Sequence, residues 1–210
     1  MKIVLIDYGG GNLHSVAKAL TMAGLGAQRC SEPDEARDAD ALVLPGQGHF
    51  RQVMESFLES GFEPVVRYHL ANQRPFLGIC VGLQLLMEAS EEAPDLPGLG
   101  LLRGTVRRFL DPRVSIPQMG WNQIFRRGDP PLLRGLPDGG FVYFANSYYP
   151  DFRDNDLSGA VTRYGNVEFT SLVSNGNLHA TQFHPEKSQT YGLKILHNFR
   201  KVVYGGESQA

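Results

Sequence analysis

Cys80 occupies the middle of an apolar run, PFLGICVGLQLL at residues 75–86, and is bracketed by Gly78 and Gly82. This spacing matches the nucleophile elbow, a sharp strand-to-helix turn that presents a reactive side chain. A Cβ at either glycine would collide with the crossing backbone, so we expect both glycines to be steric requirements. The turn predicts an exposed thiol at the start of a helix reaching about residue 89, where the helix dipole favours thiolate. The alternative, a buried structural thiol, is the interpretation we adopt for Cys30.

A cysteine nucleophile needs a base, and the segment QFHPEKS offers one in His184 with Glu186 two residues later. In an extended segment these two side chains point the same way, so Glu186 can orient the imidazole ring. The other histidines considered have ordinary contexts, a solvated or capping role in helical patterns or a place in a hairpin strand: His14, His69, His197 and His179.

The third candidate element is the glycine-containing loop Gly46, Gln47 and Gly48 in LVLPGQGHF, directly after an apolar strand. Glycines let backbone N–H groups approach a reacting carbonyl, as an oxyanion hole requires. No Lys-Ser/Thr pair follows, which excludes a Walker A phosphate loop. A second glycine run, GGGNLH at 9–14, is interpreted as a turn in which Asn12 caps a helix. The three elements together predict acyl transfer from an amide or ester through a thioester, and we expect no metal and no cofactor.

The elements that must position these residues alternate between strands and helices in the first half of the chain. Apolar runs at 2–6, 27–30, 41–44 and 75–79 are separated by helical patterns at 13–24 and within 50–72. Such alternation predicts an α/β fold with an open, twisted, mostly parallel sheet flanked by helices. The second half instead contains a hairpin signal, Asn175-Gly176 between two apolar runs, which makes the sheet mixed. A last helix is predicted over 189–203.

Composition limits the partners and the compartment. The chain has 210 residues, 42% of them apolar, and we expect one domain over 1–204 with a flexible tail over 205–210. A net charge of −2 gives no basic excess, so no nucleic-acid partner is expected. No apolar run approaches the roughly 18 residues of a membrane span, and no signal peptide is visible. With two cysteines and no disulfide framework, we predict a cytoplasmic protein without membrane contact.

Several motifs together carry a family resemblance. The GICVGLQ and HPE segments resemble the class I glutamine amidotransferases, which hydrolyse glutamine to glutamate and ammonia. Within that family, further segments are similar to the glutaminase subunits of imidazole glycerol phosphate synthase, of histidine biosynthesis: DYGGGNLHSV, LPGQGHF, MGWN at 119–122, YFANSYY at 143–149 and FHPEKSQ at 183–189. The motifs extend over nearly the whole chain. The resemblance implies the fold of the class I glutamine amidotransferases.

The resemblance also implies roles for single residues. Cys80 would be the nucleophile, His184 the base and then the acid, and Glu186 the group that orients His184. Gln84 would bind substrate glutamine, and Ser147 and Tyr148 would lie around its α-amino and α-carboxylate groups. The backbone amides of Gln47 and Gly48 would complete the oxyanion hole in the Gly46 to Gly48 loop.

A partner is expected because ammonia released into water would be protonated, and no residues remain here for a domain that consumes it. The resemblance implies a heterodimer with a (β/α)₈ barrel cyclase subunit, which makes imidazole glycerol phosphate and an aminoimidazole carboxamide ribotide. Trp121 and Lys187 are placed by their motifs to face that partner, although a lone Trp can equally belong to a core. The chain departs from the family pattern at Gln118 and Asn146, where histidines are usual, and at Gln47, where a small apolar residue is common.

Three other functions fit parts of the pattern. One is a glutaminase subunit of another synthase, such as anthranilate synthase. Another is a catalytically silent regulatory module that keeps the fold. The third is a cysteine peptidase or γ-glutamyl hydrolase that needs no partner.

Overall fold

The computed structural model describes residues 1–154 and 157–205, and in this part of the chain a nine-stranded sheet has the order β2-β1-β3-β4-β12-β11-β10-β7-β8. A smaller sheet has the order β5-β6-β9. The strands are β1 (Ile3–Ile6), β2 (Gln28–Cys30), β3 (Ala41–Gly46), β4 (Phe76–Cys80), β5 (Ala89–Ser90), β6 (Gly104–Arg108), β7 (Gln118–Arg127), β8 (Gly140–Asn146), β9 (Tyr148–Phe152), β10 (Ser158–Tyr164), β11 (Val167–Asn175) and β12 (Leu178–Thr181). The helices are α1 (Leu13–Met22), α2 (Pro33–Ala36), α3 (Phe50–Glu59), α4 (Glu63–Ala71), α5 (Val81–Gln84) and α6 (Gln189–Val203), with 3₁₀ turns η1 (Pro131–Leu133) and η2 (Pro185–Lys187).

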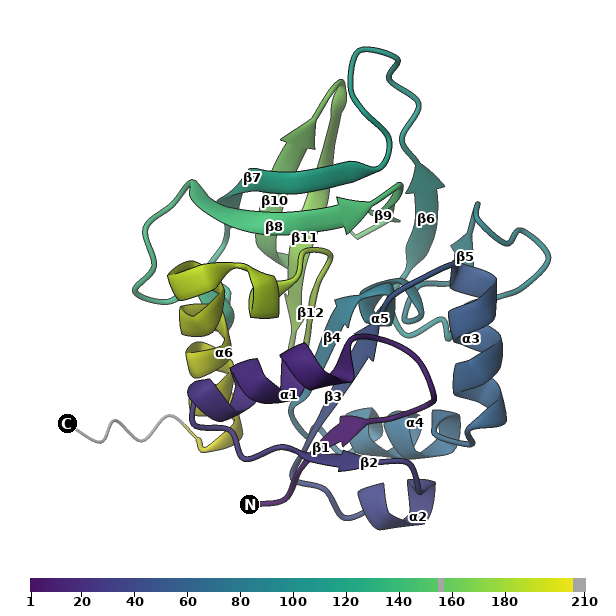
Figure 1. Ribbon diagram of the computed structural model, residues 1–210, viewed down its shortest axis with the longest axis vertical. Coiled ribbons are helices and arrows are strands. Elements are labelled where there is room, and N and C mark those ends of the chain that lie inside the picture. Colours follow the sequence, from purple (N-terminus) through teal and green to yellow (C-terminus); the bar gives the residue numbers. More distant parts are fainter. Residues whose placement is uncertain (155–156, 206–210) are drawn as a thin grey trace.

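One half of the large sheet is parallel. Strands β2, β1, β3, β4 and β12 pair in parallel and lie in the lower half of Figure 1, where α1 lies in front of them beside α6. All residues of β1, β3 and β4 are buried, which explains why these strands are almost uninterrupted apolar runs. The carboxyl ends of parallel strands share one edge, so Gly46 and Cys80 lie side by side there, in register with each other.

The other half of the sheet is antiparallel and forms the upper part of Figure 1. Strand β11 returns antiparallel to β12, and β10, β7 and β8 continue the sheet in the same manner. The register of the β11–β12 hairpin pairs Asn175 with Leu178, so Gly176 and Asn177 form the turn. The predicted turn pair, Asn175-Gly176, is therefore wrong by one residue. Gly176, with φ of +58°, takes the left-handed conformation that glycine adopts without strain.

The helix after Cys80 is much shorter than the predicted one, because α5 ends at Gln84 instead of about residue 89. The backbone carbonyls of Leu85 and Leu86, which would continue the helix, accept hydrogen bonds from N–H groups of residues 99, 101 and 102 (2.8–2.9 Å). This returning loop satisfies the carbonyl groups and ends the helix. Apolar periodicity could not predict this competition, because the loop is distant in sequence.

The remaining predictions have mixed outcomes. The Asn12 side chain accepts a hydrogen bond from the N–H of Ser15 (3.3 Å), which confirms it as the cap of α1. His69 is 1% exposed and its Nε2 lies 2.9 Å from the carbonyl of Pro75, so it is a buried link between α4 and the residue that precedes β4, and not a solvated side chain. The predicted tail lies outside the described residues, except for Gly205. Within residues 1–154 and 157–205, no helix is both long enough and apolar enough to cross a membrane.

Candidate active site

The backbone at Cys80 has the geometry of a nucleophile elbow. Cys80 ends β4 with φ of 55° and ψ of −111°, a strained conformation for a side chain with a Cβ. A Cβ on Gly82 would overlap the carbonyl oxygen of Leu44, and one on Gly78 would lie 3.2 Å from the Cβ of Ala180. The predicted collision with crossing backbone is therefore confirmed at Gly82, whereas at Gly78 the added Cβ would make tight contacts without overlap. Strain at a residue of this type is characteristic of functional sites.

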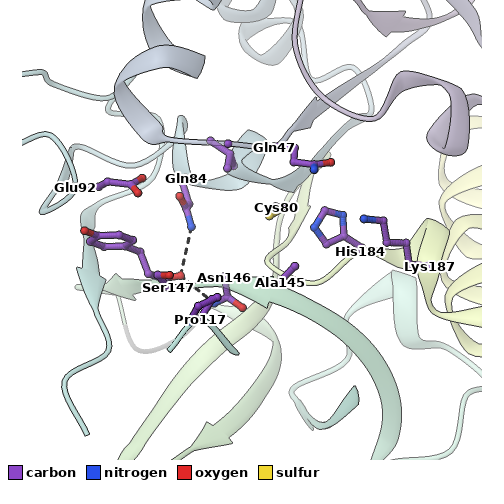
Figure 2. A pocket seen from close by; sticks show the side chains of 13 residues that line it. Gln47, Cys80, Gln84, Glu92, Pro117, Ala145, Asn146, Ser147, His184 and Lys187 are labelled. Atoms are coloured by element: carbon purple, nitrogen blue, oxygen red, sulfur yellow. Dashed lines mark hydrogen bonds between the residues drawn. The ribbon is translucent and has the colours of Figure 1, made fainter. Parts of the chain in front are cut away.

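The prediction of an exposed thiol is wrong, because only 3% of the surface of Cys80 is accessible. It lies instead at the bottom of a cavity of about 280 Å³, between the end of β4 and the segment from β8 to β9. Figure 2 shows its sulfur in the centre, with Gln84 on one side and His184 on the other. A four-residue helix also carries little dipole, so the contribution predicted from the helix dipole at Cys80 is small.

His184 and Glu186 are in contact, as predicted. Nδ1 of His184 lies 2.8 Å from Oε1 of Glu186, and the Glu186 side chain is only 1% exposed. The segment is not extended up to Glu186, because Pro185–Lys187 forms the 3₁₀ turn η2. Burial lowers the pKa of His184, but the charge of the Cys80 sulfur and that of Glu186 outweigh it, and the pKa is raised overall. The raised pKa favours the protonated form of the His184 ring.

The backbone of His184 is fixed by strand β8. Its N–H donates to the carbonyl of Tyr143 (2.9 Å) in an isolated antiparallel bridge. The hydroxyl of Ser188 accepts from the N–H of Tyr143 (2.9 Å) and donates to the carbonyl of His184 (2.6 Å). Ser188 is buried, so these bonds are shielded from water. The antiparallel half of the sheet therefore sets the position of the base.

The glycine-containing loop after β3 lies at the rim of the cavity, to which Gln47 and Gly48 contribute. Gly46 is not part of the lining. It ends β3, and a Cβ there would overlap the backbone N of Gly82, so its smallness allows β3 and the elbow to pack closely. Gly48 has φ of +116°, a conformation open to glycine.

Tyr8 was not predicted to belong to the site. Its buried hydroxyl donates to the carbonyl of Pro45 (2.9 Å) and so holds the end of β3 just before the glycine loop. Burial, with the charges of Cys80 and Asp7, raises the pKa of Tyr8 well above its ordinary value, so the hydroxyl keeps its proton. The available signal was its place just after β1, at the sheet edge where parallel strands put functional residues.

The opposite wall of the cavity comprises Gln84, Ser147 and Tyr148, all predicted, together with Glu92, which was not. Gln84 Nε2 lies 3.4 Å from the carbonyl of Tyr148, the bond drawn in Figure 2. Glu92 is the acidic residue of the lining, and its Oε2 accepts from the N–H of Phe50 at the start of α3 (2.7 Å). No sequence pattern marks Glu92, because it comes from an irregular loop.

Gln182 is another residue that sequence reasoning missed. It is fully buried, and its Nε2 lies 3.6 Å from the sulfur of Cys80 while its Oε1 accepts from Gln84 Nε2 (2.9 Å). The available signal was its spacing, since Gln182 lies two residues before His184.

The two residues predicted to meet a partner lie near the cavity mouth but differ in position. Lys187 lines the cavity, and its Nζ is 5.8 Å from the ring centre of Tyr143. Trp121 lies on the outer face of β7, 46% exposed, edge-to-face with Tyr143 (6.1 Å between ring centres). Such exposure excludes a core role for Trp121.

Two of the three residues that depart from the family pattern face each other. Gln118 on β7 and Asn146 on β8 are direct cross-strand partners, and both are buried. Asn146 Nδ2 donates to the carbonyl of Tyr148 (2.9 Å), and Asn146 also lines the cavity. Neither group titrates, so neither can transfer a proton in place of a histidine.

Among the described residues, no group of three or more His, Cys, Asp or Glu side chains is arranged to hold a metal ion.

Comparisons with known proteins agree with this geometry. Residues 4–202 match the family described as glutamine amidotransferase class-I. The imidazole glycerol phosphate synthase subunit HisH of Deinococcus radiodurans is 52% identical over 203 residues, covering 96% of this chain and 94% of that protein. A HisH subunit of Thermus thermophilus is also 52% identical, over 93% of this chain and 95% of its own. A HisH subunit of Dehalococcoides mccartyi is 45% identical, over 97% of this chain and 98% of its own.

Solved structures with lower identity share the fold. A crystal structure of a glutamine amidotransferase aligns with a TM-score of 0.73 at 22% identity, over 96% of this chain and 98% of that one. The glutaminase domain of Trypanosoma brucei CTPS with bound acivicin aligns with a TM-score of 0.72 at 16% identity, over 100% and 96%. The predicted fold class and family resemblance are therefore confirmed: the chain belongs to the class-I glutamine amidotransferases and, within them, to the family of the imidazole glycerol phosphate synthase subunit HisH.

Proposed function

We propose that the chain hydrolyses L-glutamine to glutamate and ammonia through a Cys80 thioester, as the glutaminase subunit of imidazole glycerol phosphate synthase in histidine biosynthesis. One observation carries the proposal: a strained, buried cysteine shares a small cavity with a histidine that a buried carboxylate orients. Membership of the HisH family favours this synthase over anthranilate synthase. We place the reaction in the cytoplasm, where the thiol stays reduced.

The chemistry follows from the pairing of Cys80 and His184. His184 takes the thiol proton, and the Cys80 sulfur attacks the side-chain carbonyl carbon of glutamine to give a tetrahedral oxyanion. The backbone N–H groups of Gln47 and Gly48 stabilise the oxyanion. His184 then gives its proton to the departing nitrogen, so ammonia leaves and the thioester remains. A water molecule, deprotonated by His184, attacks the thioester, and glutamate and the free thiol are released. Glu186 stabilises the imidazolium in both steps.

The distribution of polar groups in the cavity orients the substrate. Glu92, Gln84 and Ser147 lie on one side of Cys80 in Figure 2, and His184 and Lys187 lie on the other. The α-amino group of glutamine pairs with Glu92, and the α-carboxylate meets the backbone at Ser147 and Tyr148. This places the side-chain amide over the sulfur and sends ammonia toward His184 and Lys187.

The nucleophile can be tested with a matched pair of cysteine variants. Cys80→Ser should lower glutamate production from glutamine by about 10³-fold or more, because a serine hydroxyl stays protonated beside His184. Cys30→Ser serves as the control, since Cys30 lies on β2 with its sulfur 3.1 Å from the carbonyl of Glu32 and takes no part in the cavity lining. Substantial turnover by Cys80→Ser would contradict the proposal.

The proposed partner is a (β/α)₈ barrel cyclase subunit that docks beside the cavity mouth. We define the docking face as Met119, Trp121, Tyr143 and Lys187. Met119 and Trp121 are 68% and 46% exposed on the outer face of β7, while Lys187 also reaches the cavity. Exposed aromatic and apolar side chains of this kind are frequent in protein interfaces. A barrel seated there would receive ammonia before it reaches solvent.

Binding of the cyclase can be measured by titration calorimetry. Trp121→Ala should weaken the complex by about 10-fold or more, because buried aromatic anchors dominate interfaces. Tyr68→Ala is the control, since Tyr68 has a similar exposure (49%) and belongs to α4, which lies at the bottom of Figure 1 while β7 lies near the top. Glutaminase activity should rise strongly when the cyclase and its nucleotide ligand are added. Equal affinity for both variants would reject this docking face.

A further inference from the structure

Gln182 is a buried glutamine between β12 and His184 whose side chain reaches the nucleophile. Its amide nitrogen lies 3.6 Å from the sulfur of Cys80, and its amide oxygen accepts from Gln84 Nε2 at 2.9 Å. The side chain has no exposure to solvent. Gln182 is absent from the cavity lining, so it does not touch a ligand bound there. Any effect it has on the reaction must therefore act through Cys80 or Gln84.

The orientation of the Gln182 amide is set by its neighbours. A glutamine amide has a donor end and an acceptor end, and its partners decide which end points where. The backbone carbonyl of Tyr148 can only accept, so Gln84 turns its NH₂ group toward it (3.4 Å). The same NH₂ group also reaches Gln182, which must present its oxygen there. Gln182 is left with its own NH₂ group facing the sulfur.

A donor aimed at the sulfur distinguishes thiolate from thiol. A thiolate is a good acceptor, and a hydrogen bond to the charged form of a group favours that form. Cys80 is buried, which by itself disfavours a thiolate. The short helix α5 contributes little dipole to offset this cost. The Gln182 N–H supplies stabilisation on the side of the sulfur away from solvent.

We propose that Gln182 is a positioning residue that holds Cys80 in its thiolate form, in an orientation imposed by Gln84 and the carbonyl of Tyr148. The inference rests on the proposed role of Cys80 as nucleophile. It extends the site by a chain of hydrogen bonds, called the relay below, that runs from the cavity wall at Tyr148 to the Cys80 sulfur. In it the carbonyl of Tyr148 fixes the Gln84 amide, and Gln84 fixes the Gln182 amide. No bond is made or broken by Gln182 itself.

The test is the pH dependence of Cys80 alkylation by iodoacetamide, which reacts with thiolate. Peptide mass spectrometry separates Cys80 from Cys30, and the assay needs no glutamine turnover. Gln182→Met keeps the size but removes the donor, and should raise the midpoint of the alkylation profile by about one pH unit. Gln182→Glu should raise it further, because a carboxylate repels the thiolate.

Two further variants provide a control, Gln118→Met, and a test of the relay, Gln84→Met. Gln118→Met changes a buried glutamine whose amide atoms have no hydrogen-bond partner within residues 1–154 and 157–205, and should leave the midpoint unchanged. Gln84→Met frees the Gln182 amide to rotate and should give a smaller rise. An unchanged midpoint in folded Gln182→Met, or in Gln84→Met if the former does not fold, would overturn the inference. A shifted midpoint together with full glutaminase activity of Cys80→Ser would instead reject the proposed function alone.

Discussion

Two segments carry the proposed triad, the elbow at 76–86 and the His184 segment at 178–188, and they hold their functional groups differently. Cys80 is fixed by backbone geometry, because Gly46, Gly78 and Gly82 let strand and helix cross within contact distance. His184 is fixed by polar contacts, through Glu186 on its ring and through Ser188 and the strand β8 on its backbone. Steric fixation admits almost no change, whereas hydrogen bonds can be removed one at a time.

The largest effect is expected where fixation is steric. Gly82→Ala would place a Cβ on the carbonyl of Leu44, which lies in the rigid strand β3 and cannot yield. We expect a loss of more than about 4 kcal/mol in the free energy of unfolding. Gly26→Ala is the control, with open space around the added carbon and a change within about 0.5 kcal/mol. Denaturant unfolding measures the stability of both variants. Similar stabilities would show that Cys80 is not held by steric packing around Gly82.

A large effect on catalysis is expected from the ring contact of His184. Glu186→Gln keeps the shape but removes the charge that favours the imidazolium, so kcat should fall by between about 10²- and 10⁴-fold. Glu168→Gln, a partly exposed residue of β11 in an ion pair with Arg163, should leave kcat unchanged. Stopped glutaminase assays with the cyclase present provide the values. A reduction smaller than about 10-fold would mean that Glu186 does not orient the base.

The same segment contains a second buried histidine whose pKa moves in the opposite direction. Burial lowers the pKa of His179 to about 4, and its Nδ1 lies 2.9 Å from the hydroxyl of Ser174. As the pH falls, the unfolded chain protonates His179 near the ordinary pKa of 6.5, whereas the folded chain does so only near 4. The stabilising contribution of the neutral ring is therefore complete above pH 6.5 and is lost as the pH falls toward 4.

The consequence is measurable by denaturant unfolding at pH 7 and pH 5. The wild type should lose about 2 kcal/mol more than His179→Gln over this interval, because only the wild type has a side chain at position 179 that binds a proton when unfolded and stays neutral when folded. Parallel pH dependence of the two proteins would show that His179 is not held neutral.

The smallest effect is expected from one backbone anchor of His184. Ser188→Ala removes the hydroxyl that joins Tyr143 to His184, and should cost about 1–2 kcal/mol of unfolding free energy and a few-fold in kcat. Ser60→Ala is a suitable control for the general loss of a serine hydroxyl, since its hydroxyl donates only within the end of α3 (2.6 Å to the carbonyl of Phe57). Equal kcat losses for both would mean that the anchor does not position the base.

The elbow was the part of the site most open to prediction, because its signal is local. Gly78, Cys80 and Gly82 lie within five residues, so the spacing could be read from the sequence, although the atom that excludes a Cβ at Gly82 is the carbonyl oxygen of Leu44 in the neighbouring strand β3. The length of α5 was wrong for the opposite reason. The loop that captures the carbonyls of Leu85 and Leu86 starts more than ten residues later, and local periodicity carries no information about it.

The amino-acid sequence by itself determined the α/β class, the family, and the contact of His184 with Glu186, since apolar runs, glycine spacing and side chains two residues apart depend on nearby backbone. Only the tertiary structure decided that Cys80 is buried, that Gly46 serves packing, that Glu92 lines the cavity, and that Tyr8 and Gln182 contact Pro45 and Cys80 from outside it. Each of these depends on atoms that are distant in the chain. Their positions follow from how the two halves of the sheet meet, and no short stretch of sequence encodes that arrangement.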